Sequence, residues 1–323
     1  KKLHGGRLVM IINHNISALN THRQLGANTN AVQKSLEKLS SGLKINRAGD
    51  DAAGLAISEK MRGQIRGLEM ATKNAQDGIS LIQTAEGALN ETHAILQRMR
   101  ELAVQAANDT NTEADRAELQ KEVDQLAEEL TRIAENTEFN TKKLLNGDFS
   151  ATFHIGANEG QNIEIEISPM DATALQVAGV LEEDTADVTV DGIEFSDQTV
   201  LTLNGDVYAV KVGDDYYRLS DLEAVEEDDG SGNTTTELKA KSTAQALEVG
   251  EGDTVAINIS TQESADAAIT TINNAIETVS AERSKLGAVQ NRLEHTINNL
   301  GASAENLQAA ESRIRDVDHT EAA

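Results

Sequence analysis

The chain has 323 residues, a length that predicts two or three domains rather than one compact unit. It contains no cysteine, which excludes disulfide bonds and thiolate chemistry. Its net charge is −26, and residues 170–262 alone hold 21 acidic residues and 4 basic ones. Because such a surface repels phosphate groups, we expect no nucleic-acid partner.

The start of the chain and its lack of long apolar runs bear on targeting. Residues 1–12 include charged residues, and they lack the long apolar core and small-residue cleavage site of a secretory signal peptide. No run of 18 apolar residues occurs, so we expect no membrane span. Export by the signal-peptide route is therefore not expected, which leaves other export routes open.

The first predicted helix, residues 10–39, has an interrupted apolar pattern. Its apolar positions fall into two partial stripes, Ile12, Ile16 and Leu19 followed by Val32, Leu36 and Leu39. Partly exposed apolar stripes mark contacts with a partner. The alternative is that this helix frays or packs back on its own chain, because alone it would be marginal in water. We favour contact with a partner.

Two further helices are predicted at residues 55–108 and 112–136. The intervening residues 109–112 predict a turn, and Asn111 or Thr112 can cap the later helix. Alternating steps of four and three residues along both helices meet mainly apolar side chains, among them Leu89, Leu96, Leu126 and Leu130. Such a stripe is the seam through which one long helix packs on another.

The middle of the chain predicts β-structure. Residues 149–155 and 161–167 alternate between apolar and polar side chains around a five-residue loop, which predicts a β-hairpin. Residues 170–262, the insert, contain short strand-like runs at 187–193, 199–203, 208–212 and 254–259, and residues 226–233 predict an exposed loop. We expect the insert to be a small α+β or β-rich domain.

The apolar stripe returns in a last predicted helix, residues 264–317. Its seam includes Ile276, Leu286, Leu293 and Leu300. Because a lone helix cannot bury such a stripe, the two distant ends of the chain are expected to pack together. The fold class is therefore predicted as mainly α: an elongated, discontinuous, coiled-coil-like helical bundle with a β-hairpin and a small inserted domain.

No arrangement of residues suited to catalysis or cofactor binding is visible. No two histidines lie three or four residues apart, no zinc motif occurs, and the insert contains no histidine. Paired acidic residues are frequent, and we expect none of them to have the apolar surroundings that would raise a carboxyl pKa. We expect no cofactor, no metal and no enzymatic activity, with an enzyme housed in the insert as a remote alternative.

Several strings of residues resemble a known family. Residues 10–20 (MIINHNISALN), 39–46 (LSSGLKIN) and 48–57 (AGDDAAGLAI) are similar to the start of bacterial flagellin. Residues 97–106 (QRMRELAVQA) resemble its central helix, residues 154–158 (HIGAN) its hairpin, and residues 312–318 (SRIRDVD) its C-terminal region. The resemblance covers residues 10–168 and 264–318.

The resemblance implies a domain plan and a function. It assigns residues 1–45 to a terminal filament-core helix, residues 46–169 with 263–318 to a helical rod, and residues 170–262 to a variable surface domain. Residues 1–9 and 319–323 lie outside the family pattern. The implied function is a self-assembling structural subunit of the extracellular flagellar filament, exported without a cleaved signal peptide by the flagellar secretion apparatus with an export chaperone.

The resemblance also implies an animal partner, the flagellin-sensing Toll-like receptor. The positions that match the family's recognition residues are Arg98, Leu102 and Glu122. Arg98 and Leu102 lie four residues apart, so they are expected to share a helix face and to form one patch. The alternative reading is ordinary helix surface and seam.

Two expectations concern the end of the chain and the place of the protein in the flagellum. In the family, a further helix follows the position of Asp318, and here five other residues follow instead. We therefore expect this chain to polymerise poorly. The alternative function is a junction or adaptor protein between hook and filament, which the string at residues 97–106 and the long insert disfavour.

Overall fold

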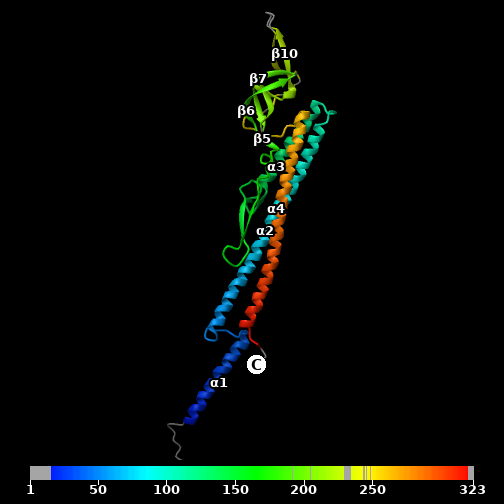
Figure 1. Ribbon diagram of the computed structural model, residues 1–323. Coiled ribbons are helices and arrows are strands. Elements are labelled where there is room, and N and C mark those ends of the chain that lie inside the picture. Colours follow the sequence, from blue (N-terminus) through cyan, green and yellow to red (C-terminus); the bar gives the residue numbers. More distant parts are fainter. Residues whose placement is uncertain are drawn as a thin grey trace, which may run out of the picture. The chain divides into compact units, whose positions relative to one another are not determined.

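The computed structural model describes residues 16–318 apart from positions 191, 204, 229–233, 243, 245 and 248 (Figure 1). Residues 10–15 of the first predicted helix, including Ile12, lie outside the described residues, as do residues 1–9 and 319–323. The chain divides into two compact units. Unit 1 comprises Lys1–Asn74, His154–Gln161 and Thr296–Ala323, and unit 2 comprises Ala75–Phe153 and Asn162–His295.

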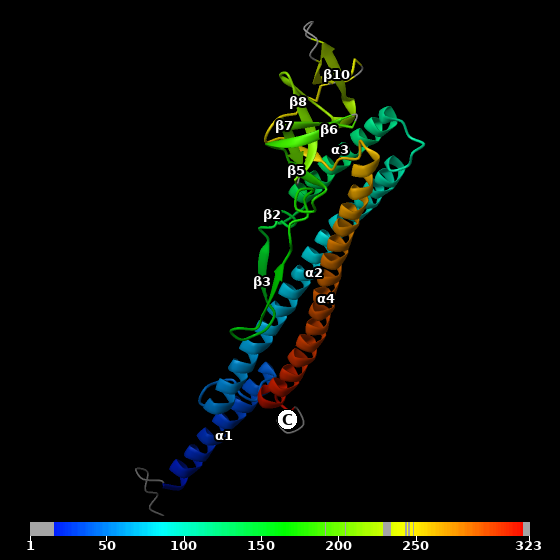
Figure 2. The same ribbon diagram turned by 45° about the horizontal axis from the view of Figure 1, so that its top comes forward.

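Four helices dominate the fold, which confirms the predicted mainly α class. They are α1 (Ile16–Ser41), α2 (Ala52–Ala106), α3 (Glu113–Asn136) and α4 (Gln262–Arg315). Helices α2 and α4 contain 55 and 54 residues, and each contributes to both units. Within unit 2, both views show α2 and α4 side by side (Figures 1 and 2).

The start of α3 follows from a capping box. The N–H of Asp115 donates to the hydroxyl of Thr112 at 3.3 Å, and the N–H of Thr112 donates to the Asp115 carboxylate at 2.9 Å. Of the two predicted caps, Thr112 is therefore the one used. The backbone N–H of Thr112 and then its hydroxyl, which both donate to the Asp115 carboxylate, hold the pKa of Asp115 below its ordinary value. The side chain of Arg116 donates to the carbonyl oxygen of Ala106 at 2.8 Å. It thereby gives a hydrogen-bond partner to one of the carbonyl groups that the end of α2 leaves unpaired.

The apolar seams of the helices are largely buried. Leu89, Leu96, Leu130, Leu286 and Leu293 have no exposed side-chain surface in unit 2, and Leu300 is buried in unit 1. Burial of each such leucine stabilises the fold by about 1.5–3 kcal/mol. Two predicted seam residues, Leu126 and Ile276, are only half-buried. Their neighbours Ala127 and Ala275 take the covered positions instead.

In unit 2, α2 and α4 each bury one polar side chain in the seam. The hydroxyl of Thr92 is buried and has no hydrogen-bond partner among the described residues. Glu282 is also buried, but its carboxylate accepts hydrogen bonds from Lys285 at 3.1 Å and from Ser168 at 3.4 Å. Glu282 thereby ties the end of the β-hairpin to α4, because Lys285 also donates to the carbonyl oxygen of Glu166 at 2.7 Å.

The predicted β-hairpin is present as β3 (Ser150–His154) and β4 (Asn162–Glu166). Ile163 and Ile165 are buried, and Asn162, Glu164 and Glu166 are exposed, as the alternation predicted. A preceding small hairpin, β1 (Glu138–Phe139) with β2 (Lys142–Lys143), was not predicted. In unit 1, the hairpin tip contacts α2 closely: a Cβ atom on Gly67 would lie 3.0 Å from Cβ of Ala157.

The insert is β-rich, as predicted. Strands β6 (Glu182–Val190), β7 (Ile193–Leu203), β8 (Asp206–Val212) and β9 (Asp215–Tyr217) form an antiparallel sheet in that order. A short 3-10 helix, η1 (Leu219–Asp221), leads to the hairpin of β10 (Leu222–Asp228) and β11 (Thr234–Ala240). Strand β5 (Ala178–Val180) pairs with β12 (Thr254–Ala256), so the entry and exit of the insert lie together.

The boundaries of two predicted segments in the insert are wrong. Residues 187–193 do not form one strand, because the chain turns at Gly192, whose φ of 81° suits glycine, and β7 begins at Ile193. Residues 226–228 are not a loop. They extend β10 and pair with residues 234–236 of β11, because the pairing of this hairpin continues past the first acidic residues.

Replacing Thr92 by valine is expected to stabilise the protein. The substitution keeps the side-chain shape and removes a buried hydroxyl without a partner, a group that costs about 1–3 kcal/mol. The free energy of unfolding, measured by urea denaturation, should rise by about 1 kcal/mol. Thr84→Val is the matched control, because the exposed hydroxyl of Thr84 bonds the carbonyl oxygen of Ser80 at 3.0 Å. A loss of stability in Thr92→Val would contradict the expectation.

Candidate assembly and recognition surfaces

Helix α1 presents its apolar side chains to solvent. None of its residues is buried. Its large apolar residues are between 40% and 72% exposed: Ile16, Leu19, Leu25, Val32, Leu36 and Leu39. The last four are spaced by seven, four and three residues, so they lie along one face of the helix. This face, which we call the α1 stripe (Leu25, Val32, Leu36 and Leu39), is a surface for contact with another helix.

The loop that follows α1 is held firmly within unit 1. The N–H of Lys44 donates to the carbonyl oxygen of Arg315 at 2.7 Å, and the N–H of Val317 donates to that of Gly42 at 3.0 Å. Ile45 is buried, and the side chain of Asn46 donates to the carbonyl oxygen of Glu37 at 3.3 Å. The segments before α2 and after α4 are thus paired, and the last turn of α1 is bonded to the loop.

A polar network joins α2 to α4 in unit 1. The fully buried hydroxyl of Ser58 donates to the Glu311 carboxylate at 2.8 Å, and Arg62 forms an ion pair with the same carboxylate at 3.1 Å. Arg315 pairs with Glu59 at 2.8 Å. Because Glu311 is itself nearly covered, its charge depends on these partners for stabilisation.

The predicted recognition residues lie at the contact between α2 and α3 in unit 2. Arg98 of α2 donates to the Glu122 carboxylate of α3 at 2.8 Å and to Glu101 at 3.2 Å. These carboxylates, Glu122 first, raise the pKa of Arg98 above its ordinary value. Arg98 and Glu122 are about half exposed, at 48% and 43%. They form an accessible pair of opposite charges.

Leu102 does not join this exposed pair. Its side chain has no exposed surface, so the expectation of one surface patch formed by Arg98 and Leu102 is wrong. Residues four apart on a helix are displaced by about 40° around its axis, and here that rotation carries Leu102 into the seam. A sequence signal for this position was present, because Leu102 lies close along the helix to Met99 and Ala103, which are both buried seam residues.

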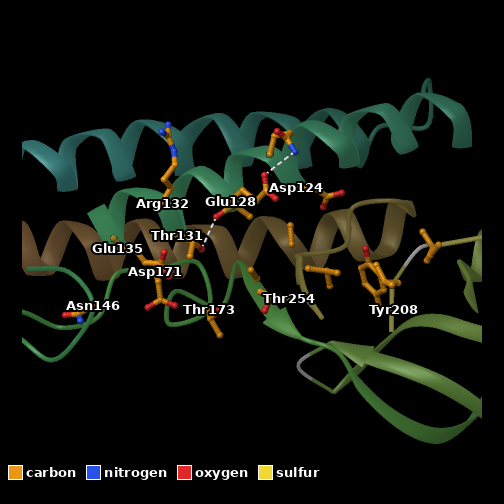
Figure 3. Close-up of a pocket in the computed structure, with 18 of the residues that line it drawn as sticks. Asp124, Glu128, Thr131, Arg132, Glu135, Asn146, Asp171, Thr173, Tyr208 and Thr254 are labelled. Carbon is orange, nitrogen blue, oxygen red and sulfur yellow. Dashed lines mark hydrogen bonds between the residues drawn. The ribbon is translucent and has the colours of Figure 1, made fainter. Parts of the chain in front are cut away.

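A cleft of about 840 Å³ lies in unit 2, between α3 and the segments at which the chain enters and leaves the insert (Figure 3). Asp124, Glu128 and Thr131 line it from α3, and Asp171, Thr173 and Thr254 line it from the facing segments. Small apolar residues such as Ala127 and Ala256 also line it. Sequence reasoning missed this cleft, because its walls come from segments that lie far apart in the chain.

Within the described residues, no cluster of three or more histidine, cysteine, aspartate or glutamate side chains is arranged to hold a metal ion. Nor does any helix in that part of the chain combine the length and apolar character needed to cross a bilayer.

Comparison with known proteins places both ends of the chain in one family. The bacterial flagellin N-terminal helical region matches residues 12–150, and the bacterial flagellin C-terminal helical region matches residues 269–323. Flagellin of Clostridium tyrobutyricum is 48% identical over 96% of this chain and 92% of its own length. Flagellin of Bacillus subtilis (strain 168) is 49% identical, again over 96% of this chain and over 88% of its own.

A third relative carries a more specific name. The flagellar filament 33 kDa core protein of Treponema phagedenis is 41% identical over 96% of this chain and 87% of its own length. The similarity to these relatives thus spans nearly the whole chain, the insert included.

Ser58→Ala is expected to destabilise unit 1. The change removes one hydrogen bond from a nearly buried carboxylate, which costs about 1–3 kcal/mol. Urea denaturation followed by circular dichroism should show a lower midpoint. Ser80→Ala is the control, because the exposed hydroxyl of Ser80 bonds the carbonyl oxygen of Gln76 within its own helix at 3.0 Å. Equal effects in both variants would show that the bond to Glu311 contributes nothing.

Proposed function

The chain belongs to the bacterial flagellin family and is a structural component of the extracellular flagellar filament, and from this premise we propose that copies of it associate through α1. Such a protein acts through contacts between copies rather than through a reaction. The surface that would make these contacts must be apolar enough to associate and must be left uncovered by the chain itself.

The exposed α1 stripe is the observation that carries this proposal. Leu25, Val32 and Leu36 are 57% to 65% exposed, although leucine and valine are usually buried in folded proteins. Their spacing matches the seam of a helix that packs on another helix. In α2 and α4 the apolar side chains with this spacing are buried. In α1 no described residue of unit 1 covers them.

The hydrogen-bonded loop between α1 and α2 supports the same role. A contact surface at the end of a flexible linker would lose affinity, because association would have to order the linker. Here Asn46 bonds the last turn of α1, and the loop is paired with the residues that follow α4. The loop therefore lowers the entropic cost of presenting the stripe.

Further partners follow from family membership as proposals. We propose that the chain is exported by the flagellar secretion apparatus with the help of an export chaperone, without a cleaved signal peptide. We also propose that the flagellin-sensing Toll-like receptor of animals recognises Arg98 and Glu122. Their half-exposed, opposite charges favour this, because a charged receptor surface could exchange partners with them. Leu102 would support this surface from beneath.

Polar substitution of the α1 stripe is expected to abolish self-association. Leu25→Asn with Leu36→Asn removes two exposed apolar side chains, and association should fall because the seam between copies loses its apolar contacts. Light scattering in precipitating salt and electron microscopy measure the outcome, and circular dichroism should show an intact fold. Gln24→Asn with Gln33→Asn on the same helix is the matched control. Equal association of both double variants would overturn the proposal.

Truncation of the charged pair is expected to weaken receptor activation. Arg98→Ala and Glu122→Ala should each lower activation of receptor-expressing reporter cells several-fold without changing thermal stability, because the pair is solvent-exposed and contributes little to folding. Arg132→Ala is the control, since Arg132 forms a similar exposed pair with Glu129 on α3.

Leu102→Ala tests whether Leu102 supports the surface formed by Arg98 and Glu122 from beneath. This change should lower receptor activation together with the free energy of unfolding, by about 2–5 kcal/mol, because it leaves a cavity in the seam. Activation at the level of the unmodified protein by both charge variants would contradict recognition at this pair.

A further inference from the structure

The chain enters and leaves the insert through a ribbon of two short strands. Strands β5 and β12 contain three residues each and pair in the antiparallel direction. The N–H of Ile257, just after β12, donates to the carbonyl oxygen of Val177 at 2.8 Å and extends this pairing. A ribbon of two strands is at best marginally stable in water unless other elements pack on it. The direction of the insert relative to α3 therefore depends on what supports the ribbon.

Gln120 of α3 supplies this support. Its side chain is fully buried. Its amide nitrogen donates to the carbonyl oxygen of Ile257 at 3.0 Å, and its amide oxygen accepts from the N–H of Ile259 at 2.7 Å. A residue of a neighbouring parallel strand would bond the same two groups, the carbonyl of one residue and the N–H two positions later. The amide of Gln120 thus takes the place of a third strand beside the ribbon.

The carboxylate of Asp124 determines how the Gln120 amide is oriented. Asp124 lies one turn further along α3 and accepts a hydrogen bond from the same amide nitrogen at 2.8 Å. An amide turned by half a rotation would direct its oxygen at two acceptors, the Asp124 carboxylate and the carbonyl group of Ile257. The observed orientation instead gives each polar atom of the buried amide a hydrogen-bond partner.

We propose that Gln120 is a positioning residue, which fixes the direction in which the insert leaves α3. Tilting the insert would separate Gln120 from Ile257 and Ile259. Ile259 has no exposed surface, so its N–H would lose its partner without gaining water. The alternative is that Gln120 only fills space, in which case an apolar side chain of similar length would serve equally well. In a filament, a fixed direction means that every copy presents its insert at the same angle.

Hydrogen exchange measures the first consequence. Gln120→Met keeps the approximate size of the side chain and removes its hydrogen bonds. Exchange of the Ile259 N–H, followed by mass spectrometry of overlapping peptides, should become about 10 to 100 times faster, because this buried group loses its acceptor. Gln125→Met is the matched control, since Gln125 is an exposed glutamine of the same helix. The control should leave this exchange unchanged.

Distance measurements between spin labels separate positioning from general stability. The chain has no cysteine, so labels can be placed at Lys121→Cys on α3 and Ser196→Cys on β7, which are both exposed. The distance distribution should be narrow in the otherwise unmodified protein and broader when Gln120→Met is added. A second pair of labels, at the exposed positions Asn90→Cys on α2 and Glu277→Cys on α4, reports on the helices alone. Its distribution should stay narrow in both proteins.

Two further variants extend the test. Gln120→Glu keeps an oxygen that can accept from Ile259, but it sets a charged oxygen against Asp124 and the carbonyl group of Ile257. It should therefore broaden the distribution between the insert and α3 more than Gln120→Met does. Asp124→Ala removes only one of the three bonds of Gln120, so it should accelerate exchange of the Ile259 N–H less than Gln120→Met does.

The proposal is overturned if Gln120→Met leaves both the exchange of the Ile259 N–H and the distribution between the insert and α3 unchanged. It is also overturned if the two pairs of labels broaden equally, because Gln120 would then contribute only to general stability. Asp124→Ala keeps the test decisive if Gln120→Met does not fold, since exchange at the unmodified rate in Asp124→Ala would equally contradict the proposal.

Discussion

The fold of this protein depends on one constraint: the apolar stripe of each long helix must be buried against a helix that lies far away in the sequence. Leu89 and Leu96 of α2 and Leu286 and Leu293 of α4 have no exposed surface. The residues between the two helices contain no second stripe of comparable length. The middle of the chain must therefore leave the bundle and return, and the entry and exit of the insert meet as the pair of β5 and β12. The position of the insert in the chain therefore follows from the connection between the long helices.

Apolar stripes alone do not determine how two long helices align, because a slip by one turn again places apolar groups opposite each other. Buried polar groups supply that information here. Ser58 bonds Glu311, Gln120 bonds the backbone at Ile257, and Glu282 bonds Ser168. Each of these bonds joins segments more than 100 residues apart and is satisfied in one alignment only, since a displaced partner would leave a buried polar group without a hydrogen bond.

The same rule separates structural surfaces from functional ones. Where an apolar stripe is covered, as in α2 and α4, it contributes to the fold. Where the chain leaves it exposed, as in α1, it is available to another molecule, which agrees with a protein that works by building a filament. The charged pair of Arg98 and Glu122 rests on the buried seam near Leu102, so recognition at that pair would depend on packing beneath it.

Sequence alone determined the parts of this protein that depend on local periodicity. The 3.5-residue stripes predicted the helices and most of the seam, the alternation at residues 161–167 predicted the hairpin strand, and family strings predicted the flagellin family. The short strand-like runs correctly indicated a β-rich insert. The local pattern could not place strand ends, because residues 187–193 and 226–228 satisfy both strand and turn preferences until their partners are known.

Only the tertiary structure decided which side chains meet. A spacing of four residues put Arg98 and Leu102 on adjoining parts of one helix surface, but α2 has neighbours that cover Leu102 and leave Arg98 half exposed. Asp124 and Arg218 line the same cleft although they lie 94 positions apart, and no local signal predicts this. Periodicity is a property of a short segment, whereas burial and charge pairing depend on what the rest of the chain brings alongside it.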